Sequence, residues 1–94
     1  MAVYVDNMRA PFRGRLMCHM VADTDDELHE MADRLGLPRR SHQKPGTPHS
    51  HYDITVEARA VALQLGALDI GRRQLVMLIR RKRAAMQHVN HCAG

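Results

Sequence analysis

The strongest constraint on the fold is the segment LMCHMVA at residues 16–22, which is apolar throughout except for His19. A strand with one face in water alternates apolar and polar residues, whereas a nearly continuous apolar run is typical of a strand covered on both faces. The chain therefore has to place other elements above and below a sheet that contains this strand.

Shorter patterns predict those elements. Further strands are predicted at 2–6, 51–54 and 67–70, helices at 25–35, 56–65 and 72–89, and loops at 7–15 and 38–50. Strands that alternate with helices indicate an α/β or α+β domain. We expect a small single domain of three or four short strands and three helices, in the order β-β-α-β-α-β-α.

The first and last helices have the clearest patterns. Thr24 followed by Glu27 forms a capping box, which satisfies free amides at the start of a helix. Apolar residues then recur at helical spacing, at Leu28, Met31, Ala32 and Leu35. The stripe of the last helix comprises Leu75, Leu78, Ile79, Lys82, Met86 and Val89. We expect both stripes to face the protein interior.

The length of 94 residues allows one hydrophobic core, which we place in residues 1–88, with 89–94 as a C-terminal tail. The core is predicted to be aliphatic, because the chain has seven Met, no Trp, two Tyr and one Phe. A domain this small is marginally stable alone, so we expect a homodimer.

The sequence favours a cytoplasmic location without membrane contact. No apolar run approaches the roughly 18–20 residues that a membrane span requires. The N-terminus has Asp6 and lacks the basic-then-apolar order of a signal peptide. Cys18 and Cys92 make no disulfide framework, so both are expected as free thiols in a reducing compartment.

The segment HSHYDI places three titratable side chains at strand spacing. In a strand, His49, His51 and Asp53 would point to one face, and Tyr52 and Ile54 to the other. Two imidazoles and a carboxylate in a row suit three roles: holding a metal, binding a phosphate, or hydrogen-bonding to one another.

A larger pocket is predicted from Asp6, His19, His51 and Asp53, which lie at strand interiors or ends. In an α/β fold, polar groups at the carboxyl ends of adjacent strands converge on one crevice. Histidine and carboxylate ligands suit Zn, Mn or Fe. The alternative is structural, since buried polar groups are normally paired with one another, and an Asp6–His19 or a His51–Asp53 hydrogen bond needs no metal.

Other residues would complete such a pocket. Asp23 and His49 are expected as outer members, and Arg13 and Arg15 as groups that face an anionic ligand. A metal held there would activate water for phosphoester hydrolysis. The sequence alone leaves enzymatic activity open.

A rival hypothesis arises from the charge distribution. Residues 71–94 carry six Lys or Arg and no Asp or Glu, whereas residues 1–70 are slightly acidic. Arg80, Arg81, Lys82 and Arg83 would give the last helix a basic surface for nucleic acid or an acidic protein partner. The alternative is neutralisation by the acidic first helix of the same chain or of a second copy.

Several motifs together carry a family resemblance. VYVD, MRAPF, MCHMVAD, DELHEMADRLG, QKPGT, HYDI and LGALDI occur in that order. In this the chain resembles the domain of unknown function 4031 family, over residues 1 to about 75. The resemblance implies a short, soluble, cytoplasmic protein of bacteria or their phages, and it implies no activity.

Overall fold

The computed structural model describes residues 2–93, with side chains described through residue 87. The elements in chain order are β1 (Val3–Val5), β2 (Ala10–Phe12), β3 (Arg15–Ala22), α1 (Asp25–Arg34), a 3₁₀ turn (Arg39–Ser41), β4 (Tyr52–Thr55), α2 (Val56–Gln64), β5 (Leu68–Asp69) and α3 (Arg72–Ala93). They form a small α+β domain, which confirms the predicted fold class.

The sheet is built around β3, the long apolar strand. Met20 of β3 pairs with Val5 of β1 at one edge and with Tyr52 of β4 at the other, both antiparallel. β5 adds to β1 as a parallel strand. The sheet is therefore mixed and has five strands, one or two more than predicted.

The extra strand is β2, which lies inside the segment predicted as a loop at 7–15. β2 pairs with the start of β3, from Ala10 opposite Met17 to Phe12 opposite Arg15. The two connecting residues, Arg13 and Gly14, have φ of 49° and 78°. Positive φ at both positions is what a two-residue type I′ hairpin requires. The prediction of an uninterrupted loop was wrong because backbone pairing, rather than an apolar pattern, makes this strand.

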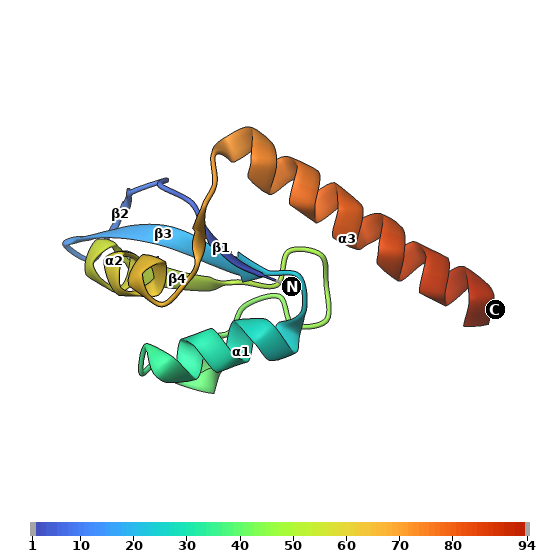
Figure 1. The fold of residues 1–94 in the computed structure, drawn as a ribbon, viewed down its shortest axis with the longest axis horizontal. Coiled ribbons are helices and arrows are strands. Elements are labelled where there is room, and N and C mark those ends of the chain that lie inside the picture. Colours follow the sequence, from blue (N-terminus) through green and yellow to red (C-terminus); the bar gives the residue numbers. More distant parts are fainter. Residues whose placement is uncertain (1, 94) are drawn as a thin grey trace.

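The two faces of the sheet are covered differently. α1 and α2 pack on the face that carries Val5, Cys18 and Met20, and together these elements form the main core. On the opposite face, among the residues whose side chains are described, α3 covers part of the sheet through a small cluster of Val21, Ile70 and Leu78. Figure 1 shows α3 running off the sheet toward the C-terminus, on the side opposite α1. Polar residues of this second face therefore remain accessible.

The local patterns of both helices are confirmed. The Thr24 hydroxyl accepts from the Glu27 amide at 3.2 Å, which is the N-cap bond of the predicted capping box, and it donates to the Glu27 carboxylate at 2.8 Å. On the apolar stripe of α3, Leu75 and Leu78 pack against the sheet and Lys82 is buried, whereas Met86 lines a hollow with the loop at 46–48. Val89 and the predicted tail 89–94 lie outside the residues whose side chains are described. Among the described residues, no helix has the length and apolar character needed to cross a membrane.

Candidate functional site

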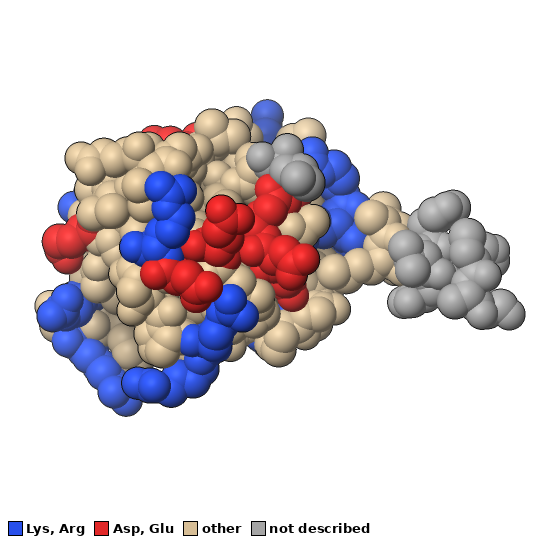
Figure 2. All heavy atoms as spheres, turned by 60° about the horizontal axis from the view of Figure 1, so that its bottom comes forward, with Lys and Arg blue, Asp and Glu red and all other residues tan. Residues whose placement is uncertain are grey.

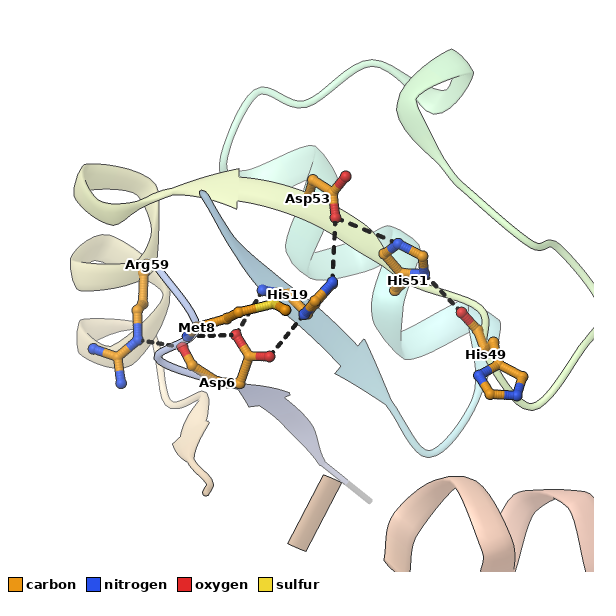
Figure 3. Close-up of polar contacts among 7 residues, drawn as sticks. All are labelled: Asp6, Met8, His19, His49, His51, Asp53 and Arg59. Atoms are coloured by element: carbon orange, nitrogen blue, oxygen red, sulfur yellow. Dashed lines mark hydrogen bonds and ion pairs between the residues drawn. The ribbon is translucent and has the colours of Figure 1, made fainter. Parts of the chain in front are cut away.

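Three predicted site residues come together in the middle of the half-covered sheet face. His19 lies on β3, and Asp53 on β4 is its direct cross-strand partner. His51 precedes β4 and points the same way as Asp53, as strand alternation predicts. We expected a crevice at the carboxyl ends of adjacent strands, and this was wrong. The cluster lies instead across β3 and β4, which are antiparallel and pair side by side (Figure 3).

The distances within this cluster suit one ion. His51 Nε2 lies 3.3 Å and His19 Nε2 lies 3.8 Å from the same oxygen, Oδ1 of Asp53. One ligand atom from each residue lies within 4.8 Å of the other two. Ligands bound at about 2.1 Å in a tetrahedral arrangement are roughly 3.4 Å apart, so a metal ion fits with small side-chain shifts. The three side chains are partly exposed and therefore open to a ligand from solvent.

Asp6 fixes the orientation and tautomer of His19. Its Oδ2 lies 2.7 Å from His19 Nδ1, and its Oδ1 accepts the amides of His19 and Met8 at 2.7 and 3.3 Å. Burial raises the pKa of Asp6, but the bonds from His19 and from the amides outweigh it and leave the pKa below its usual value. The ionised carboxylate accepts a hydrogen bond from Nδ1–H, and Nε2 faces Asp53.

The pKa of His19 shifts in the opposite direction. The hydrogen bond to Asp6 raises it most, burial lowers it, and the charges of Asp6 and Asp53 raise it further, for a net rise above the usual value. His19 is therefore a more basic imidazole than usual, and it becomes a good metal ligand once Nε2 has lost its proton.

The other two members of the cluster have outer partners of the same kind. His51 Nδ1 donates to the backbone carbonyl of His49 at 2.7 Å, because a carbonyl can only accept. His51 Nε2 is thereby left free to bind. Gln43 Nε2 donates to Asp53 Oδ2 at 2.7 Å, which leaves Oδ1 as the free carboxylate oxygen.

In each of the three residues, then, an outer partner occupies one polar atom and the remaining atom points into the cluster. When both imidazoles are neutral, the three free atoms are all acceptors, and a shared proton or a cation between them offsets their repulsion. Two histidines and one carboxylate, each oriented by an outer hydrogen bond, form a set typical of metal sites with open coordination positions.

Several predicted members of the pocket lie elsewhere. His49 precedes the strand in a turn, so it contributes its carbonyl to the cluster while its ring accepts from Arg83 at 2.9 Å. Asp23 directly follows β3 and binds Ala2, Tyr4 and Arg81 instead of the cluster.

Arg13 and Arg15 sit at the β2–β3 hairpin, where the Arg13 guanidinium lies 5.1 Å above the ring of Phe12. Neither is among the described residues that line the two hollows beside His19.

The basic residues predicted to form one surface on α3 have different environments. Arg81 pairs with Asp23 at 2.9 Å, whereas Arg80 makes no ion pair within the described part of the chain. Lys82 is not on the surface: it is buried on the inner stripe, and its Nζ donates to the carbonyl of Ala22 at 2.8 Å. Burial lowers the pKa of Lys82, against the attraction of nearby carboxylates.

A second polar network behind the cluster was not predicted. The fully buried Ser50 donates to Asp25 at 2.6 Å and lies 2.6 Å from His42 Nε2, and the ring of His42 stacks on Tyr52. His29 in turn bonds the Tyr52 hydroxyl at 2.8 Å. This network fixes the loop before β4 to α1, and it thereby positions the segment that carries His51.

Two single contacts were also missed. Gln43 supports Asp53, and the Nε of Arg59 on α2 donates to the carbonyl of Asp6 at 2.6 Å, a contact between residues 53 positions apart. The isolated backbone bridge between Gln43 and His51 places the side chain of Gln43 within reach of Asp53. No local sequence signal distinguishes these residues from ordinary surface polar groups.

Fold and cluster define the class: a small α+β protein with a preformed cluster of two histidines and one carboxylate on an accessible sheet face. The chain belongs to the family described as "Protein of unknown function (DUF4031)", whose profile matches residues 3–82. This confirms the resemblance and extends it into the first half of α3. Neither the curated proteins nor the solved structures contain a match to the chain.

Proposed function

We propose that the protein binds one divalent transition metal ion, Zn, Mn or Fe, through His19, His51 and Asp53. The observation that carries this proposal is that all three free ligand atoms are oriented by outer partners. Asp6, predicted as a ligand, takes the role of outer partner to His19, because its oxygens are occupied by the three bonds described above.

Three protein ligands leave coordination positions for water and substrate, as in catalytic rather than structural metal sites. A metal ion in such a site lowers the pKa of bound water and polarises a phosphoryl oxygen. Hydrolysis of phosphoesters is therefore the activity that we propose. The setting is the cytoplasm of a bacterial or phage-infected cell, for which a buried, unpaired Cys18 is suited.

Calorimetric titration of metal-free protein with Zn²⁺, Mn²⁺ and Fe²⁺ tests the proposal. We expect one site per chain, lost in Asp53→Ala and retained in Asp69→Ala, whose exposed carboxylate pairs with Arg59 instead. Loaded protein should then hydrolyse 4-nitrophenyl phosphate, and the Asp53→Ala variant should not. Equal binding by both variants would refute the assignment.

A second candidate function is association with a second copy through α3. Val76 and Met77 are 41% and 61% exposed on this helix, beside the exposed Arg73 and Arg80. Figure 2 shows acidic side chains gathered over α1, where residues such as Glu30 are exposed. A basic, partly apolar helix and an acidic helix are complementary, so a homodimer would pair them reciprocally.

Sedimentation tests this candidate. A salt-sensitive dimer that Arg80→Glu dissociates, and that Glu30→Arg restores in the same chain, would support it. A monomer that shifts only when DNA or RNA is added would instead assign the basic helix to nucleic acid.

A further inference from the structure

Two hollows flank His19 beneath α3 and share part of their walls. One has a volume of about 360 Å³ and the other about 590 Å³. His19, Leu75 and Ile79 line both of them. They are therefore two halves of one groove, with His19 and His51 of the cluster in its floor and α3 as its roof.

The two halves differ in the polar groups that they carry. The smaller half has mainly apolar walls but holds the side chains of Lys44, His49 and His51, and Arg83 donates to the ring of His49. Lys44 has a positive φ, at 56°, in a turn that Thr47 closes through two hydrogen bonds to the Lys44 carbonyl.

The larger half is mainly apolar. Met8, Ile70 and Val76 line it together with the shared Leu75 and Ile79, and Asp6 and Arg72 add charged groups to its wall. Met8 and Val76 are 61% and 41% exposed, so apolar surface is left open beside the cluster. Covering such surface with an apolar group of a ligand lowers the free energy and so favours binding.

We infer that the groove binds a phosphoester with an apolar organic group. The phosphate lies over the cluster and against Lys44, and the organic group lies in the larger half between Met8 and Val76. This inference rests on the proposed metal site, and it adds the substrate class and a positioning role for Lys44.

Two non-hydrolysable probes test it: phenylphosphonate and methylphosphonate, titrated calorimetrically into Zn²⁺-loaded protein. We expect phenylphosphonate to bind about tenfold more tightly, because its ring buries apolar surface in the larger half. Val76→Asn should reduce this ratio at least threefold while methylphosphonate binding stays the same. Met77→Asn is the matched control, since the neighbouring side chain lies outside the groove, and it should leave the ratio unchanged.

Lys44→Ala should weaken both probes by a similar factor, about five- to tenfold, and Lys44→Arg should restore most of the loss. Equal affinities for the two probes in zinc-loaded protein would overturn the groove assignment alone. So would a ratio that Met77→Asn lowers as much as Val76→Asn. Failure of the wild-type chain to hold zinc would overturn the proposed function, and this inference with it.

Discussion

Replacing Asp6 with Asn tests whether the outer partners prepare the cluster for a metal. The Asn oxygen can still accept the amides of His19 and Met8, which turns its NH₂ group toward His19 Nδ1. Nδ1 must then accept, so the imidazole proton moves to Nε2, the atom that faces Asp53. A protonated Nε2 cannot bind a metal.

The expected magnitude follows from the bond that is lost. A hydrogen bond to a charged group contributes about 1.5–3 kcal/mol, which corresponds to roughly 10- to 100-fold in affinity. Removal of the outer partner of a metal-bound histidine typically weakens metal binding by a similar factor, about 10- to 100-fold. We therefore expect Asp6→Asn to weaken zinc binding by about 30-fold or more.

Competition with a chromogenic chelator measures this affinity, and circular dichroism verifies that the variant is folded. Asp23→Asn is a suitable control, because that carboxylate also bonds an amide and a side chain but lies away from the cluster. A folded Asp6→Asn variant with wild-type zinc affinity would refute the reasoning about the tautomer.

Three further outcomes are expected. Ser50→Ala should lower the free energy of unfolding by about 3 kcal/mol in urea titrations, because it removes one charge-assisted and one neutral hydrogen bond; a loss below about 1 kcal/mol would contradict the network. Burial raises the pKa of Asp25, but the bonds from Ser50 and a backbone amide outweigh it and leave the pKa below 3.8. The ionised Asp25 therefore contributes its full stabilisation above pH 3.8, and this stabilisation is lost as the pH falls through the lowered pKa. The loss of unfolding free energy caused by Ser50→Ala should thus become smaller in urea titrations at acid pH. A loss that stays the same at all pH values would argue against this role of Asp25. Thr24→Ala should cost about 1 kcal/mol by loss of the N-cap, whereas Thr24→Ser should cost far less.

Local patterns in the sequence predicted the elements that depend on local chemistry. The capping box at Thr24, the buried stripe of α3 and the apolar run of β3 each specify one element, and the structure has all three. The alternation of His51 and Asp53 likewise placed both side chains on one face, because strand geometry has a period of two.

What the sequence did not predict depends on contacts between distant segments. β2 exists because its backbone pairs with β3 across a two-residue turn, and Gln43 reaches Asp53 because a bridge aligns their segments. The expectation that His49 continues the strand failed for a related reason: its segment turns to bring Ser50 against α1. Side-chain spacing alone carries no information on such pairings.

The proposed metal site on the partly covered face of the sheet can be tested by the metal content of the untagged protein, measured by mass spectrometry for wild type, His51→Ala and His49→Ala. We expect about one equivalent in wild type and in His49→Ala, which keeps the carbonyl that orients His51, and almost none in His51→Ala. A wild-type chain that holds no Zn, Mn or Fe, even after incubation with each ion and dialysis, would contradict it.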